Sequence, residues 1–174
     1  PASARPEHAG QSIPAGPGKL NYRLEYASQS DYADGADTID ASYYHVMAGG
    51  TVSGVTVNLG HEVLGGDGTY GFSTPLATVH AFNGWADKFL GTPADGLTDT
   101  YIDASTAISG TKFKAVYHLF AADQGSADYG TELDLLAARK VNQYLALALK
   151  FADYRADNWA TDTRKVWVQA NVSF

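Results

Sequence analysis

Strict alternation of apolar and polar residues is the main regularity of this 174-residue sequence. Near the end of the chain an apolar set of residues alternates with a more polar set. The apolar set is Val166, Val168, Ala170, Val172 and Phe174, and the other set is Lys165, Trp167, Gln169, Asn171 and Ser173. Because successive side chains of a strand point to opposite faces, this pattern predicts a strand with one apolar and one polar face. The same period appears repeatedly in the preceding sequence.

Eight segments of this kind are predicted, each close to the length of about 9–11 residues that a tilted membrane strand needs. They cover residues 19–29, 38–49, 54–64, 98–108, 111–122, 131–141, 143–154 and 164–174. Their connectors alternate between short (50–53, 109–110 and 142) and long (30–37, 65–97, 123–130 and 155–161). Short turns at one rim and long loops at the other are typical of bacterial outer-membrane barrels. The pattern therefore predicts an all-β, antiparallel, up-and-down transmembrane β-barrel.

The two ends of the chain add to this prediction. Residues 1–18 hold four of the six prolines and little periodicity, so an irregular Pro-rich arm on the periplasmic side is expected there, followed by a barrel domain over residues 19–174. A last strand that stops on Phe174 resembles the closing strand of outer-membrane barrels, in which the terminal aromatic residue is an assembly signal. The expected location is the bacterial outer membrane.

A soluble barrel would show the same alternation, with its apolar face turned inward. Three features favour the membrane barrel. The polar faces carry small or isolated charged residues, the final residue is Phe174, and tyrosines and phenylalanines gather near the strand ends as in an aromatic girdle. A soluble ligand-binding barrel stays open as an alternative.

Composition and charge exclude several other classes. The net charge of −7 argues against nucleic-acid binding, which needs a basic surface. The absence of cysteine excludes disulfides and thiolate metal sites. No run of about 18 apolar residues is present, so no transmembrane helix is expected.

The sequence does not predict an enzyme, a cofactor or a metal site. Metalloprotease, serine-hydrolase and P-loop motifs are absent. Residues 66–71 spell G-x-G-x-x-G, but no helix or βαβ unit is predicted around them, so they are expected to be a turn-rich loop. One hydrolytic alternative stays open, because Ser105 and His118 lie on adjacent predicted strands and on the same face.

The polar face of the predicted barrel carries charges of both signs. The expected pore-lining residues are Arg23, Glu25, Asp40, Glu62, Asp103, Lys114, His118, Asp134, Lys140, Lys150 and Lys165. Rings of basic side chains favour anions, whereas ion pairs across a narrow bore would close it. Both readings are compatible with the sequence.

The connector over residues 65–97 is long enough to have a function of its own. Phe82, Trp85, Ala86 and Phe89 have the i, i+3, i+4, i+7 spacing that predicts a short amphipathic helix. As a long extracellular loop it could fold into the mouth and narrow it, or pack on the rim. The expected constriction residues are His80, Phe82, Trp85, Lys88 and Phe89.

Several stretches resemble the C-terminal half of bacterial alginate-export-type outer-membrane porins: residues 62–68, 72–90, 115–118, 129–134 and 149–154. The resemblance implies a channel that passes an anionic polysaccharide or a related solute through a basic conduit, with Arg23, Lys114, Lys140, Lys150 and Lys165 as candidate lining. Barrels of that family are much larger than eight strands. Acidic residues of the predicted bore, such as Glu25 and Asp134, also depart from a purely basic conduit.

The leading hypothesis is a porin-like channel for passive passage or export of small or anionic solutes. The eight strands would then be the C-terminal half of a larger barrel, completed by missing N-terminal strands or by self-assembly. The alternative is a small closed barrel of eight strands, whose interior is just wide enough for side chains, with a structural or loop-mediated binding role. Expected partners are outer-membrane lipid, lipopolysaccharide and a small polar or anionic solute.

Overall fold

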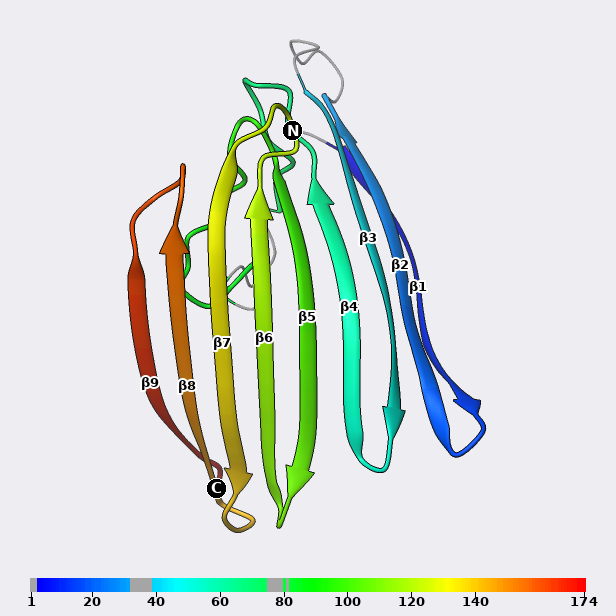
Figure 1. Ribbon diagram of the computed structural model, residues 1–174, viewed down its shortest axis with the longest axis vertical. Coiled ribbons are helices and arrows are strands. Elements are labelled where there is room, and N and C mark those ends of the chain that lie inside the picture. The colour runs from blue at the N-terminus through cyan, green and yellow to red at the C-terminus, as the bar shows by residue number, and fades with distance from the viewer. Residues whose placement is uncertain (1–2, 32–38, 75–79, 81) are drawn as a thin grey trace.

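The chain forms one antiparallel sheet of nine strands in chain order (Figure 1). The computed structural model describes residues 3–31, 39–74, 80 and 82–174. The strands are β1 (Ser3–Ala15), β2 (Gly18–Ser30), β3 (Asp40–Val52), β4 (Val55–Leu64), β5 (Leu97–Ile108), β6 (Thr111–Ala121), β7 (Asp128–Lys140), β8 (Leu145–Ala156) and β9 (Thr163–Val172). Each pairs with its sequence neighbours, and among the described residues nothing pairs with the outer edge of β1 or β9.

Strands β2 to β9 confirm the predicted antiparallel up-and-down architecture and lie close to the eight predicted segments. The segment predicted at 111–122, for example, is observed as Thr111–Ala121. Alternation with period two predicts these strands because each of them lies between an apolar and a polar environment along its whole length. The eight strands do not close into a small barrel, because the sheet continues into a ninth strand and stays open.

Strand β1 corrects the prediction of an irregular arm over residues 1–18. Residues 3–15 pair in register with β2, from Ser3 opposite Ser30 to Ala15 opposite Gly18. Two prolines fit because β1 has a neighbour on one side only, and proline is tolerated on edge strands. With this added strand the chain starts at the long-loop end of the sheet, not at the short-turn end as predicted (Figure 1).

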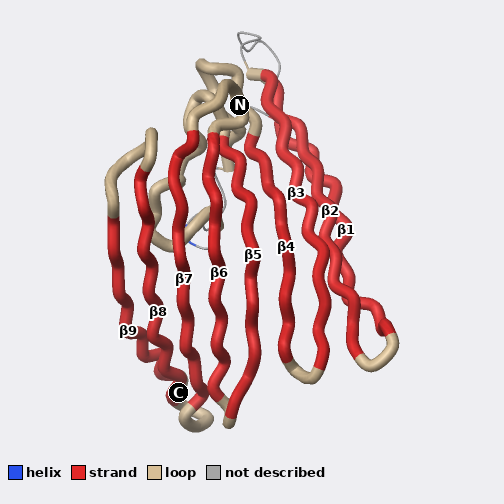
Figure 2. Tube along the Cα trace, viewed as in Figure 1, coloured by secondary structure: helices blue, strands red, loops and turns tan. Residues whose placement is uncertain are grey.

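The connectors separate into two rims (Figure 2). The short-turn rim consists of residues 16–17, 53–54, 109–110 and 141–144. The described residues of the long connectors are 31, 39, 65–74, 80, 82–96, 122–127 and 157–162, and the end of the sheet from which these connectors leave is called the long-loop rim. The turns Ser53–Gly54 and Ser109–Gly110 have positive φ at both positions (51° and 80°, 50° and 78°), as in type I′ hairpins. Such turns match the twist of the flanking strands and keep this rim short.

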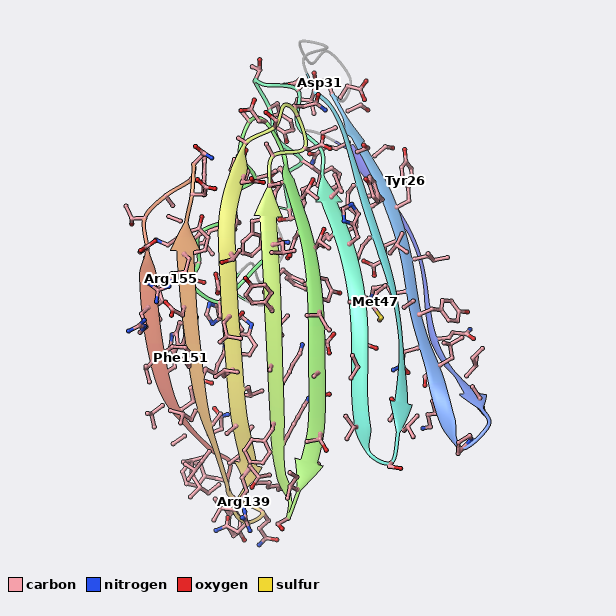
Figure 3. All side chains as sticks on the ribbon, in the orientation of Figure 1. Tyr26, Asp31, Met47, Arg139, Phe151 and Arg155 are labelled. Atoms are coloured by element: carbon pink, nitrogen blue, oxygen red, sulfur yellow. The ribbon has the colours of Figure 1, made fainter. Side chains whose placement is uncertain are left out.

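The two faces of the sheet differ in chemistry. The described residues of the connector between β4 and β5 fold against one face, which is called the inner face. The opposite, outer face carries large apolar side chains that are widely exposed, among them Leu24 (51%), Leu59 (63%) and Val168 (82%). Figure 3 shows Tyr26 projecting from β2 on this outer side. An apolar surface this extensive favours contact with an apolar environment.

The apolar core lies between the inner face and the described residues of the connector between β4 and β5, near the long-loop rim. It includes Phe72 and Phe89 from the loop and Leu97, Phe120 and Tyr154 from the strands. Within the described part of the chain, no helix has the length and hydrophobicity needed to cross a membrane.

Candidate functional site

The described residues of the connector between β4 and β5 (65–74, 80 and 82–96), here called the inward loop, pass behind the sheet and lie against its inner face (Figure 1). The loop leaves β4 with a hydrogen bond from Gly65 N to Ser42 O (2.7 Å) and turns back with one from Phe72 N to Gly65 O (2.8 Å). The described residues of the loop form no α-helix, so the predicted amphipathic helix is wrong. Asn83, Gly84 and Asp87 have positive φ (52°, 84° and 61°), which interrupts a helix despite the suitable apolar spacing.

Carboxylates of three strands anchor this loop. Asn83 Nδ2 donates to Glu62 Oε2 of β4 (2.8 Å) and to Asp99 Oδ2 of β5 (3.3 Å). The next two anchors use the loop backbone: Trp85 N donates to Asp134 Oδ2 (3.1 Å) and Ala86 N to Glu132 Oε1 (2.7 Å), both on β7. Each of these buried carboxyl groups receives a hydrogen bond from the loop, so the contacts hold residues 83–86 on the wall.

Gly84 is the residue that permits this approach. A Cβ placed on it would lie 2.5 Å from Glu132 Oε2, and its φ of 84° is one that other residues rarely adopt. Any larger residue would therefore push the loop away from β7.

Glu132 and Asp134 are fully buried beneath the loop. His118 lies beside them: its Nδ1 is 2.8 Å from Asp99 Oδ1 and its Nε2 is 3.8 Å from Asp134 Oδ2. Among the described residues, Glu132 Oε2 and Asp134 Oδ1 have no hydrogen-bond partner. The acids of this part of the wall are thus enclosed between strands and loop, away from open solvent.

A second anchor joins the loop to β8 and β9. Lys165 Nζ donates to Asp87 Oδ2 (2.7 Å), and His80 Nδ1 lies 2.5 Å from Asp87 Oδ1. Lys150 Nζ lies 2.9 Å from His80 Nε2 and 4.3 Å from the centre of the Trp85 ring. Because an ammonium only donates, His80 accepts through Nε2 and donates through Nδ1 to the carboxylate.

The neighbouring Lys165 and His80 favour the ionised form of Asp87. Burial acts to raise its pKa, but hydrogen bonds from Lys165 and His80 outweigh that effect and lower the pKa below the usual 3.8. Asp87 is therefore an ionised contact between loop and wall over the ordinary pH range.

Aromatic packing fixes the end of the loop. Phe89 contacts the rings of Phe120 (4.6 Å between centroids), Tyr129 (6.0 Å) and Trp159 (6.4 Å). Trp159 Nε1 also donates to Lys88 O (3.2 Å). Phe89 thus belongs to the buried core at the rim, whereas Phe82 is half exposed.

On β2 to β5, inner-face side chains form a polar network. Tyr43 Oη donates to Glu25 Oε2 (3.0 Å) and to Glu62 Oε1 (2.8 Å), and His45 Nε2 lies 2.9 Å from Tyr101 Oη. Asp40, which has the opposite parity on the same strand, was predicted to line the pore, so the predicted facing of this strand is inverted.

Because of this inversion, Asp40 does not lie on the inner face, where it was predicted to line the pore. Asp40 has the parity of Tyr44 and Val46, which are exposed on the outer face, and it lies there at the start of β3. The other predicted lining residues lie on the inner face: Arg23, Glu25, Glu62, Asp103, Lys114, His118, Asp134, Lys140, Lys150 and Lys165. Their contribution to a pore stays a prediction.

The predicted lining does not include Asn83 or Asp99, which are central to the anchor. Asp99 could have been found, because it shares the parity of Asp103 on the same strand. No sequence pattern predicts the role of Asn83 in the anchor, because that role depends on where an irregular loop lies in the folded structure.

Lysines gather on the inner face towards the short-turn rim: Lys19, Lys112, Lys114 and Lys140, at the starts of β2 and β6 and the end of β7. Within the described part of the chain none of the four forms an ion pair. The acids lie nearer the loop, so the inner face is basic at one rim and acidic beneath the loop.

The Ser105 and His118 pair does not form a hydrolase-like arrangement. Tyr101 is opposite His118, whereas Ser105 is opposite Lys114, four residues further along β5. Among the described residues, no group of three or more His, Asp and Glu side chains is arranged to hold a metal ion.

Comparison with solved structures gives matches in fold, among them the following three. OccAB4 of Acinetobacter baumannii has a TM-score of 0.77 at 17% identity, over 98% of this chain and 46% of its own. OccK5 (OpdH) of Pseudomonas aeruginosa has a TM-score of 0.66 at 17% identity, over 98% of this chain and 51% of its own. OccK8 (OprE) of the same organism has a TM-score of 0.65 at 17% identity, over 97% of this chain and 52% of its own. The sequence matches no protein-family model, and no curated protein is significantly similar.

The chain has the fold of an outer-membrane porin wall. The porin-like sheet spans about half the length of each of the three structures. The resemblance to the alginate-export type is not supported, since the matches are of the Occ type.

Proposed function

We propose that this chain forms about half of the wall of an outer-membrane channel, through which small polar solutes, preferentially anions, pass without catalysis. One observation carries the proposal: a loop is anchored by hydrogen bonds against the polar inner face of a sheet whose outer face is aliphatic. A loop held inside a polar bore narrows it and sets its chemistry. The likeness to Occ porins supports the same function.

The preference for anions rests on which charges the bore leaves available. Glu62, Asp99, Glu132 and Asp134 accept hydrogen bonds from the loop or from neighbouring side chains. The lysines near the short-turn rim have no such partners within the described residues, so the field at that mouth is positive.

The alternatives fit the structure less well. A plugged barrel of eight strands requires closure after eight, but the sheet has nine strands and is open. A soluble barrel would bury its apolar face inward, whereas here the inner face carries buried carboxylates and the outer face carries exposed aliphatic side chains.

The test is a planar-bilayer recording of the natively assembled barrel that contains this chain. Stepwise conductance, with a reversal potential in a KCl gradient that favours chloride, is expected. A folded, inserted barrel without conductance would overturn the channel function, and a cation-favouring potential would overturn the anion preference.

Lys140 and Arg139 provide a matched pair of variants for that recording. Lys140→Glu places a negative charge on the inner face and is expected to shift the reversal potential towards cations. Arg139 is the preceding residue, at the short-turn end of β7 and on the outer face (Figure 3), so Arg139→Glu makes the same change of charge outside the bore. Equal shifts in both variants would contradict a lining role for Lys140.

A further inference from the structure

The outer face carries a hollow of about 430 Å³ over β5 to β8, here called the outer hollow. Three of its lining residues are the alanines Ala104, Ala115 and Ala137, and larger side chains stand around them: Phe113, Leu135 and Leu149. In the register of the sheet these six residues form two neighbouring rows. One row runs from Ala104 through Ala115 to Leu135, and the other from Phe113 through Ala137 to Leu149. The hollow exists because small side chains interrupt both rows.

The outer hollow is apolar and open. Phe113, Leu135 and Leu149 are 42%, 41% and 51% exposed although they border a concave surface. Thr106, the register partner of Phe113, adds one hydroxyl to the lining. Ligand sites are typically concave, about 300–1,000 Å³ in volume and mostly apolar with a few polar groups. The outer hollow therefore has the size and chemistry of a site for an apolar chain.

Arg139 places a positive charge beside the hollow, at the short-turn end of β7 (Figure 3). It follows Ala137 by two residues, so both side chains point to the outer face and lie about 7 Å apart along the strand. Within the described part of the chain Arg139 forms no ion pair. The outer-face residues at the short-turn ends of the neighbouring strands are uncharged: Val55, Ile108, Thr111 and Leu145.

The order of charge and hollow along β7 decides which ligand fits. A guanidinium binds phosphate through paired N–H donors. From Arg139 at the rim, the hollow extends towards the middle of the sheet, where an acyl chain of a membrane lipid would lie. A molecule with a phosphate at the membrane surface and an acyl chain below it is a phospholipid. Short turns of outer-membrane barrels face the periplasm, so this lipid belongs to the periplasmic leaflet.

We propose that Arg139 and the outer hollow bind one phospholipid with a net negative headgroup, its phosphate on Arg139 and an acyl chain over Ala137 and Ala115. The proposal rests on the proposed function, because it requires the outer face to lie in a membrane. It assigns one position on that face to one lipid, since a concave surface and an unpaired cation coincide there. Basic side chains near the membrane surface attract anionic lipids, which favours this headgroup over a zwitterionic one.

Native mass spectrometry of the natively assembled barrel, with added phosphatidylglycerol, tests the hollow. Ala137→Phe fills the hollow, and the wild-type barrel is expected to retain one phosphatidylglycerol more than this variant. Ala48→Phe is the matched control, because Ala48 is on the outer face opposite Leu59 and does not line the hollow. Equal retention by the two variants would overturn the proposal. So would a preference of the site for phosphatidylethanolamine or for lipid A, or a second barrel on this face in place of lipid.

A second pair of variants tests the charge, and it does not depend on the folding of Ala137→Phe. Arg139→Gln is expected to weaken the retention of phosphatidylglycerol about fivefold, the effect of one basic side chain near an anionic membrane surface. Arg155→Gln is the control, because Arg155 is on the same face but at the long-loop end of β8 (Figure 3). Equal weakening in both variants would overturn the role of Arg139.

Failure of this inference differs from failure of the proposed function. Ala137 and Arg139 lie outside the bore, so their variants are expected to keep the conductance of the wild-type barrel. A conducting barrel whose variants all retain the lipid equally would overturn the phospholipid site alone. A barrel that retains the lipid at this site but does not conduct would overturn the channel alone.

Discussion

Each buried carboxylate on the inner face has a specific hydrogen-bond donor. Glu62 accepts from Tyr43 and Asn83, Asp99 from Asn83, and Asp103 from Asn58, while Glu132 and Asp134 accept from loop amides. Buried charges persist in proteins when they are paired or hydrogen-bonded. At the residue scale these acids mainly hold the inward loop against the sheet, and they contribute correspondingly little to the charge of a bore.

Asn83→Ala is expected to loosen the inward loop. The substitution removes the donor shared by Glu62 and Asp99, and leaving buried acceptors without it costs about 1–3 kcal/mol. Hydrogen exchange at Trp85 and Ala86 in the natively assembled barrel should become faster. Asn58→Ala is the control, because Asn58 donates to Asp103 between strands and does not touch the loop. Unchanged exchange in Asn83→Ala would contradict the anchoring role.

Asp87 makes the docking of the loop sensitive to acid. Its pKa is lower in the docked loop than the usual 3.8, so docking is favoured at pH above 3.8 and the contribution is lost as the pH falls through the lowered value. The protection of the amides of residues 82–89, measured against their intrinsic exchange rates at each pH, should fall on acidification through that range. Asp87→Asn should show low protection at all pH values and lose this dependence. If the Asp87→Asn variant kept the pH dependence, a titratable group other than Asp87 would be its cause.

At the scale of elements, the inward loop shows how an irregular segment is held in place. Side chains of β4, β5, β7 and β9 hold residues 83–87 of the loop against the sheet. Close approach to β7 is possible only because residue 84 has no side chain.

Gly84→Ala is expected to displace the loop from β7. The added Cβ would meet the Glu132 carboxylate, and the positive φ adds strain, together costing about 1–3 kcal/mol of docking. Gly91→Ala is the matched control in the same loop, since a Cβ there meets nothing within 4 Å. Larger single-channel conductance in Gly84→Ala than in Gly91→Ala is the expected result. Equal conductance would place the loop outside the conducting path.

At the scale of the whole molecule, the sheet is a two-sided wall. The outer face presents aliphatic side chains along β2 to β9, and the inner face presents charges, amides and the inward loop. The basic rim and the acidic region beneath the loop are separated along the strands, so a solute in the bore would meet different charges at different depths. The open edges require further strands before such a bore is enclosed.

Neighbouring residues of β9 test this two-sidedness. Val168 is on the outer face and 82% exposed, and Gln169 is opposite Ala148 on the inner face. Val168→Lys should destabilise the inserted barrel by about 2–4 kcal/mol, the cost of a lysine near the middle of the lipid face. Gln169→Lys should be tolerated. Urea unfolding of the natively assembled barrel in lipid vesicles measures both, and equal stability would argue against lipid contact at β9.

Much of the fold could be predicted from local pattern, and the failures have physical causes. β1 was missed because its prolines look like breakers, although an edge strand tolerates them. The facing of β3 was inverted because Tyr43, His45 and Met47 alternate with Tyr44 and Val46, so hydrophobicity is similar on both sides. The helix expected at Phe82 to Phe89 fails because a suitable apolar spacing does not outweigh positive φ at three of its residues.

The sequence by itself determined the strands, their short and long connections and the chemistry of most faces, because alternation with period two is a local property that each strand carries along its own length. Only the tertiary structure decided where the inward loop rests, which carboxylates hold it, and that two edges running in the same direction are left open. Those features depend on residues far apart in the chain, such as Asn83 with Glu62 and Asp99, and on the number of strands between two edges. A local sequence pattern predicts neither the contacts of the loop nor the direction of the edge strands, because both depend on how the whole sheet is paired.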